Sequence, residues 1–295
     1  MKLKGIIYIL IGAGSFGLTP IFVKTGFGYD YSLGQINIVQ MVLALILLGA
    51  MCFFKGLKIE NLSKPDFIKV MITGAAMGLT SIFYYGAMQY LSASLAIILL
   101  FQFVWIGMIY EWIFSKARPT LVNVLALLVT LTGVVLASNI IVDGVTNLHP
   151  IGLLLGFLSG VSYAGFIFFS GRVATSSHPF IRSLLMVTGA TVLVSSVFFR
   201  DIPSLNPSDG RLWLLGIGLA LVGGVMPTLF FAKGAPLISG RLANVLSSIE
   251  LPVAIVSAMI VLSESVSLLQ WCGVVLILVA IVINELGGVM KKGKT

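Results

Sequence analysis

Long apolar runs separated by short polar breaks dominate the chain. Each run approaches the length of about 20 residues that a helix needs to cross the hydrocarbon core of a bilayer. The breaks carry turn or charge signals, as at Lys116-Ala-Arg-Pro119 and Ser176-Ser-His-Pro179. The pattern predicts an all-α membrane protein of about ten spanning helices, over residues 5–26, 33–54, 67–89, 93–115, 119–141, 150–171, 180–199, 212–232, 241–262 and 267–286.

The composition supports this class of protein. Of the 295 residues, 58% are hydrophobic and 9% are charged, and the mean hydropathy is +1.10. A soluble domain carries about 25% charged residues, so too few charges remain here to cover a surface that faces water. Lipid is therefore expected around the helices. Both cysteines, Cys52 and Cys272, lie in apolar runs, and we interpret them as small core residues with no disulfide, metal site or cofactor.

The basic residues lie in the breaks and orient the helices. If the N-terminus is cytoplasmic, 15 of the 18 Lys and Arg residues fall on the cytoplasmic side, as the positive-inside rule requires. This predicts a multi-pass protein of the cell inner membrane with both termini in the cytoplasm. No nucleic-acid partner is expected, because the basic residues are not interleaved with exposed aromatic residues. The cytoplasmic set is Lys2, Lys4, Lys55, Lys58, Lys64, Lys69, Lys116, Arg118, Arg172, Arg182, Lys233, Arg241, Lys291, Lys292 and Lys294, and the other side keeps Lys24, Arg200 and Arg211.

The chain also repeats itself at one ungapped offset of 147 residues (152 − 5 = 147). Each half has five helices, an odd number, so the second half enters the membrane from the opposite side. Inverted repeats of this kind are typical of secondary transporters. We predict two inverted five-helix repeats, residues 1–146 and 147–295, and expect the basic N-terminal segment to be retained rather than cleaved as a signal peptide. The matched pairs are Gly5/Gly152, Ser15/Ser162, Phe22/Phe169, Leu95/Leu242, Ala96/Ala243 and Leu99/Leu246.

Several segments carry a family resemblance. Ser15-Phe-Gly-Leu-Thr-Pro-Ile-Phe-Val-Lys24 resembles the first helix of EamA-type domains, and residues 87–99 and 234–252 resemble the fourth-helix segment of two successive copies. The resemblance covers nearly the whole chain and implies a ten-helix carrier of the drug/metabolite transporter superfamily. That superfamily carries amino acids, sugars, nucleotide precursors and drugs, so it does not fix the substrate. The first copy lacks the proline expected near Gln102, which predicts a stiffer helix there.

Glu250 is the sharpest candidate for function. It lies near the middle of the helix predicted over 241–262, and an ionised carboxylate at that depth is costly unless it faces protein or water. Ser247 shares its small and polar helix face. Glu250 is therefore a candidate for substrate binding and for coupling to protons. The alternative is a glutamate that only braces the helix bundle.

Other candidates occupy equivalent or neighbouring positions. Gln102 lies near the middle of the fourth helix, where it suits either hydrogen bonding to a substrate or interhelical packing. The pairs Ser15-Phe16 and Ser162-Tyr163 are related by the repeat and suit either site walls or packing. Tyr84, Tyr85 and Trp112 lie nearer helix ends and are assigned to an aromatic belt. The candidate substrate-binding residues are Glu250, Gln102, Tyr163, Phe16, Ser15, Ser162, Trp105 and Ser247.

The sequence therefore favours a secondary carrier that is not an enzyme. It would export a small, amino-acid-like metabolite by alternating access, with protons as a candidate coupling partner. Gly12-Ala-Gly-Ser-Phe-Gly17 matches a dinucleotide-binding pattern, but it lies inside a predicted spanning helix with no strand before it. The alternative is a membrane-embedded enzyme or a structural assembly factor without transport activity. The inverted repeat favours the carrier, because an enzyme needs no such symmetry.

Overall fold

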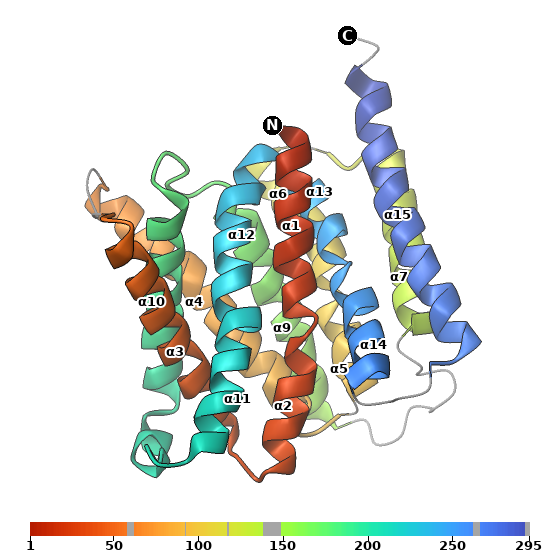
Figure 1. Cartoon of the computed structure of the whole chain (residues 1–295). Helices are drawn as coiled ribbons and strands as arrows, with labels where there is room; N and C mark the ends of the chain where they lie inside the picture. Colours follow the sequence, from red (N-terminus) through yellow and green to blue (C-terminus); the bar gives the residue numbers. More distant parts are fainter. Residues whose placement is uncertain (58–61, 92, 117, 138–148, 262–265, 293–295) are drawn as a thin grey trace.

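The computed structural model describes residues 1–57, 62–91, 93–116, 118–137, 149–261 and 266–292, and this part of the chain is helical (Figure 1). Eight helices in it are long and apolar enough to cross a membrane, and α7 and the Leu268–Ile281 part of α15 are shorter apolar helices. Together they give the ten crossings that the sequence predicts. We number the crossings 1 to 10 in chain order.

Several crossings consist of two helical pieces. The first five crossings are α1 (Lys2–Phe16) with α2 (Thr19–Gly28), α3 (Leu33–Phe54), α4 (Lys64–Ala87), α5 (Ala93–Leu100) with α6 (Phe103–Ser115), and α7 (Leu121–Ala137). The next five are α9 (Pro150–Ser170), α10 (Pro179–Val197), α11 (Gly210–Ala220) with the π-helix η2 (Leu221–Val225) and α12 (Met226–Gly234), α13 (Gly240–Ser247) with α14 (Glu250–Val261), and α15 (Leu268–Lys292). The short 3-10 helices η1 (Phe199–Ser204) and η3 (Ala235–Leu237) lie in the connections.

Local sequence signals set many of the helix boundaries. Ser32 caps α3 in a capping box with Gln35, in which each side chain bonds to the backbone N–H of the other residue. Pro150 and Pro179 begin α9 and α10, where the missing N–H costs no helical hydrogen bond. These signals place the connections in the polar breaks of the sequence.

The two halves of the chain run in opposite directions. In Figure 1, α1 begins and α15 ends at the same end of the bundle, whereas α9, the counterpart of α1, begins at the opposite end. The helix ends and connections at the first end carry most of the described basic residues, including Lys55, Arg172 and Lys233. We call it the basic end and the other the opposite end. Lys58 and Lys294 lie outside the described residues, as do the side chains of Lys291 and Lys292.

Crossings 5 and 10 form a pair beside the other eight. In Figure 1, α7 and α15 lie side by side, apart from α3 and α10 and next to α13 and α14. Gly133 and Gly273 face each other across this pair, because a Cβ on Gly133 would lie 2.8 Å from the carbonyl oxygen of Gly273. Small residues of this kind allow close helix packing in membranes. The pair therefore shields one side of crossing 9.

Glycines spaced four residues apart hold the remaining helices together, at Gly74 and Gly78 on α4 and at Gly152, Gly156 and Gly160 on α9. Gly74 on α4 packs against the backbone of Met186 on α10. Gly156 on α9 packs against Leu99 on α5, because a Cβ on Gly156 would lie 2.6 Å from a side-chain carbon of Leu99. Large apolar side chains such as Ile72 and Leu214 lie on the outside, where lipid would surround them.

Candidate functional site

Crossings 4 and 9 are interrupted at equivalent positions. Phe101-Gln102 separates α5 from α6, and Ser248-Ile249 separates α13 from α14, 147 residues further on (248 − 101 = 147). The backbone N–H of Gln102 donates to the carbonyl of Leu99, and the backbone N–H of Ile249 donates to the carbonyl of Leu246, each at 3.2 Å. These i→i−3 bonds tighten the chain into a 3-10 turn. Crossing 4 is thus interrupted although it lacks the proline, and the stiffer helix expected there stays a prediction.

A glycine from a neighbouring crossing packs against each interruption. The Cα of Gly17, which ends α1, lies against the backbone carbonyl of Glu250. In the other half, a Cβ on Gly160 of α9 would lie 2.9 Å from the carbonyl oxygen of Leu100. Crossing 1 therefore supports the interruption in crossing 9, and crossing 6 supports the one in crossing 4.

Glu250 is the first residue of α14, and its side chain faces the interior. The residue is 2% exposed, and its Oε2 atom has no hydrogen-bond partner in the described part of the chain. The hydroxyl of Tyr163 lies next to the carboxyl group without completing a hydrogen bond, and Tyr84 and Tyr85 lie within electrostatic range. The partial positive charge of a helix N-terminus favours a carboxylate at this position.

Aromatic rings form a wall beside Glu250. Tyr163 on α9 stacks on Phe16 of α1, with ring centroids 5.4 Å apart and planes 25° apart. The ring of Phe103 meets Tyr163 edge-on at 4.9 Å. Phe103 begins α6 and occupies the position equivalent to Glu250 (250 − 147 = 103). The two repeats thus place a carboxylate and a benzyl group at equivalent positions.

A buried amide extends the polar region toward crossings 2 and 8. The hydroxyl of Tyr85 faces Gln40 and Thr19, yet it makes no hydrogen bond, and neither do the two amide atoms of Gln40. Gln40 and Thr19 both pack against Gly223 in the π-helix η2. A Cβ on Gly223 would lie 2.8 Å from the Gln40 Nε2 atom and 2.8 Å from the Thr19 methyl carbon. π-Helical turns inside α-helices are frequent at functional sites.

Gln40, Tyr84, Tyr85, Tyr163 and Glu250 form what we call the central polar cluster. Each contributes at least one buried polar atom without a hydrogen-bond partner in the described structure. An unsatisfied buried polar group costs about 1–3 kcal/mol, so a cluster of them indicates a place for water or a ligand. The cluster draws three residues from the first repeat and two from the second.

The structure brings only some of the predicted site residues together. Glu250, Tyr163 and Phe16 meet as described. Gln102 and Trp105 bond to each other, with the indole Nε1 donating to the amide Oε1 at 2.7 Å, and the Gln102 amide also donates to the carbonyl of Ile98. The remaining hydroxyls bond within their own helices or to a neighbour: Ser15 to Gly12, Ser247 to Ala243, and Ser162 to Leu158, Ser159 and Thr80.

Three members of the cluster, Tyr84, Tyr85 and Gln40, are not among the residues predicted for the site. The prediction that both tyrosines belong to an aromatic belt is wrong, since each is 0% exposed, whereas Trp112 is 53% exposed. An amphipathic ring near a helix end suits either position, so residue type could not separate them. Gln40 carried a usable signal, because an amide in the middle of an apolar run is costly unless it faces protein. No three His, Cys, Asp or Glu side chains of the described residues gather into a possible metal site.

A second group of charged residues lies at the basic end. Glu111 on α6 forms an ion pair at 2.7 Å with Arg172, which follows α9, and Arg172 also donates to Ser115 at 2.9 Å. Gly240, at the start of α13, packs against the Glu111 carboxylate. This contact joins crossings 4, 6 and 9 at one end of the bundle.

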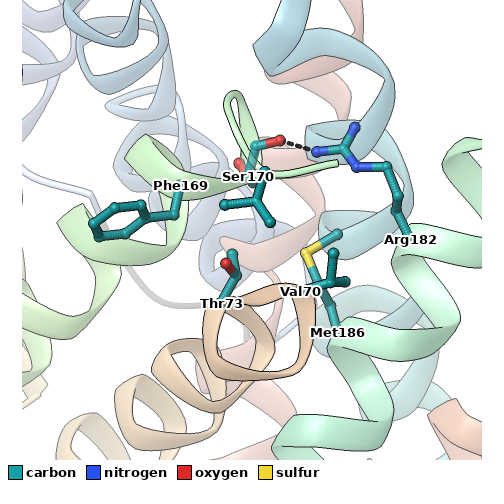
Figure 2. Close-up of a pocket in the computed structure, with 7 residues that line it drawn as sticks. Val70, Thr73, Phe169, Ser170, Arg182 and Met186 are labelled. Atoms are coloured by element: carbon teal, nitrogen blue, oxygen red, sulfur yellow. Dashed lines mark hydrogen bonds between the residues drawn. The ribbon is translucent and has the colours of Figure 1, made fainter. Parts of the chain in front are cut away.

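A small pocket at the basic end contains a buried arginine (Figure 2). Arg182 on α10 donates to the carbonyls of Ala232, at 2.8 Å, and of Ser170. These carbonyls lie at the C-terminal ends of α12 and α9, where the helix dipole favours a cation. Arg182 therefore ties three crossings together. The pocket is lined by Val70, Thr73, Phe169, Ser170, Val173, Arg182 and Met186.

Comparison with known proteins gives the same architecture. The chain is 24% identical to Uncharacterized transporter sll1319 of Synechocystis sp. over 225 residues, which cover 74% of this chain and 66% of that protein. It also shares its fold with a protein of known crystal structure, at a TM-score of 0.75 and 15% identity, over 97% of each chain. The model of the EamA-like transporter family matches residues 3–139 and again 150–285, so the two matches begin 147 residues apart (150 − 3 = 147). The chain therefore belongs to the EamA-like transporter family.

Proposed function

We propose that this membrane transporter exports a small, amino-acid-like metabolite across the cell inner membrane by alternating access, with both termini in the cytoplasm. The observation that carries the proposal is the central polar cluster. Its unpaired polar atoms come from both repeats, and Glu250 lies where crossing 9 is interrupted. Carriers built from inverted repeats place their substrate site near the bilayer midplane, at the interface between the repeats.

Polar contacts close the bundle at both ends of the cluster. At the basic end, the Glu111–Arg172 pair joins crossing 4 to the end of crossing 6. At the opposite end, the hydroxyl of Tyr31 donates to Asp209 at 2.9 Å, which joins the start of crossing 2 to the start of crossing 8. Alternating access requires the two ends to open in turn. Each set of contacts is small enough to break while the other holds.

Glu250 is the group that we propose for coupling transport to protons. The titratable groups that face it are the hydroxyls of Tyr163, Tyr84 and Tyr85, and no basic side chain of the described residues acts on it. A carboxyl group in this position can hold either a proton or a substrate, depending on which end is open. Proton and substrate would then move in opposite directions.

Transport by proteoliposomes tests the proposal. The full chain is reconstituted and supplied with a panel of labelled amino acids and amines, with and without a pH gradient. We expect at least one compound to accumulate in response to the gradient, and Glu250→Gln to lower that accumulation at least tenfold. Asp30→Asn is the matched control, because Asp30 is exposed and its left-handed backbone (φ 60°) tolerates asparagine. Accumulation by Glu250→Gln equal to that of the wild type between pH 5.5 and 8 would remove Glu250 from the mechanism.

A further inference from the structure

We propose that the ligand of the central polar cluster is an organic cation, a compact amine whose ammonium group binds the Glu250 carboxylate between aromatic rings. The proposal rests on the proposed function for its role in transport. The binding preference itself follows from the charges and rings of the cluster, and it can be tested without any transport measurement.

The charge of the cluster determines the sign of the ligand. Glu250 has one carboxylate oxygen without a partner, and no basic side chain of the described residues acts on it. Arg172, Arg182 and Lys233 all lie at the basic end, engaged with Glu111, with backbone carbonyls and with aromatic rings. A buried carboxylate needs a cation or a proton, and the α14 N-terminus supplies only a partial charge. An ammonium ligand completes this environment, whereas an anionic ligand would place two like charges side by side.

The aromatic rings supply the second element of recognition. The Tyr163 hydroxyl lies next to the carboxylate, and Tyr84 and Tyr85 lie within electrostatic range of it. Phe16 and Phe103 pack on Tyr163 at centroid distances of 5.4 and 4.9 Å. The face of an aromatic ring attracts a cation, and cages of such rings bind ammonium groups. A carboxylate among aromatic rings therefore fits an alkylammonium better than it fits an alcohol or an amide of the same shape.

Gln40 defines the other end of the ligand. Its amide has an unpaired donor and an unpaired acceptor among the described residues, and the Tyr85 hydroxyl faces this amide and lies within electrostatic range of Glu250. A carboxamide on the ligand can bond to both the Nε2 and the Oε1 atom of Gln40. A carboxylate on the ligand could accept a hydrogen bond from Nε2, but it would have no cation to neutralise its charge. We therefore expect affinity to decrease from an amine with a neutral polar group, through the zwitterion, to the anion.

Four compounds with one carbon skeleton test this order. Leucinamide carries the ammonium and the amide, leucine is the zwitterion, 4-methylpentanamide lacks the amine, and 4-methylpentanoate is the anion. Binding to the purified full chain is measured by calorimetry and by the shift in melting temperature. We expect leucinamide to bind at least tenfold more tightly than 4-methylpentanamide, and 4-methylpentanoate to bind most weakly. Equal binding of the two amides, tighter binding of the anion, or no binding of any of the four would overturn the proposal.

Variants tie the preference to the cluster. Glu250→Gln should reduce the advantage of leucinamide over 4-methylpentanamide to less than twofold. Tyr163→Leu removes the ring and should weaken leucinamide at least threefold more than it weakens 4-methylpentanamide, whereas the exposed control Asp30→Asn should leave the affinity for leucinamide within twofold. If Glu250→Gln fails to fold, the ligand order in the wild type and in Tyr163→Leu still decides the outcome. Full leucinamide preference in Glu250→Gln would place the cation elsewhere.

The two proposals can fail separately. If the ligand order holds but no compound accumulates in proteoliposomes, the cluster binds amines and the coupled-transport proposal is wrong. If a neutral or anionic compound is transported and the ligand order is reversed, the transport proposal stands and the organic-cation assignment is wrong.

Discussion

Gly17 of crossing 1 lies directly against the backbone carbonyl of Glu250, so the chain has no room for a side chain at the point where crossing 9 is interrupted. The contact joins the helix that begins the first repeat to the residue that carries the carboxyl group of the central polar cluster. It also fixes the direction in which α14 begins, and hence the position of the Glu250 carboxyl group.

Replacing Gly17 tests this contact. A Cβ in Gly17→Ala would overlap the Glu250 carbonyl, and backbone cannot rotate away as a flexible side chain can. We expect a loss of stability of about 1–3 kcal/mol, as for other overpacked sites, together with a loss of ligand binding. Gly14→Ala is the control on the same helix, because its Cβ would lie 3.6 Å from Val253 in ordinary contact. Thermal unfolding in detergent measures both, and equal melting temperatures for the two variants would contradict the assignment.

The Glu111–Arg172 ion pair should control access from the basic end. Glu111→Gln removes the charge partner of Arg172, whose side chain is 35% exposed, so we expect a stability change of only about 1 kcal/mol. The larger effect should be on the balance between closed and open states. With Cys52 and Cys272 replaced by alanine, the buried probe Ser247→Cys should react faster with a water-soluble thiol reagent when Glu111→Gln is also present. Unchanged reactivity would mean that the pair does not close this end.

The contact between Tyr31 and Asp209 predicts a pH dependence at the opposite end. The hydrogen bond from Tyr31 lowers the pKa of Asp209, and the amides of Leu212 and Arg211 act in the same direction. Since the folded pKa is the lower one, the stabilisation is present above the ordinary value of 3.8 and is lost as pH falls through the lowered pKa. Melting temperatures measured from pH 3 to 7 should fall less steeply with acid in Tyr31→Phe than in the wild type. Parallel curves would exclude the contact from acid stability.

The orientation in the membrane can be tested by labelling. Ser63 precedes α4 at the basic end, and Asn206 lies in the connection before α11 at the opposite end, and both are exposed. In the background without native cysteines, an impermeant thiol reagent added to intact cells should label Asn206→Cys and spare Ser63→Cys. The reverse result would place the basic end outside the cell.

Much of the fold could be predicted from the sequence because each crossing is an apolar run bounded by local signals such as Ser32 and Pro179. The interruption at Phe101-Gln102 could not, since neither glycine nor proline marks it. There the close approach of Gly160 to the Leu100 carbonyl accompanies a turn that the local sequence does not require.

The candidate site also contains residues that could be predicted from the sequence and residues that could not. Glu250 could be identified because a carboxylate in the middle of an apolar run is costly, and such residues are mostly kept for function. Gln102 and Trp105 looked similar, but their side chains satisfy each other three residues apart on one helix. Tyr84 and Tyr85 were misassigned because the path of α4 into the interior depends on its packing against α9 and α10, which is a property of the whole bundle.

The pairing of Glu250 with Phe103 at equivalent positions has a thermodynamic consequence. In a carrier with two identical inverted halves, the inward-open and outward-open states are related by symmetry and have equal energies. Under the proposed mechanism, a carboxylate in one half and a benzyl group in the other would contribute to removing that degeneracy, so the two states would differ in energy even without a ligand or a gradient. Protonation of Glu250 would then act on one state more than on the other, and this departure from the repeat would bias the carrier toward one resting direction.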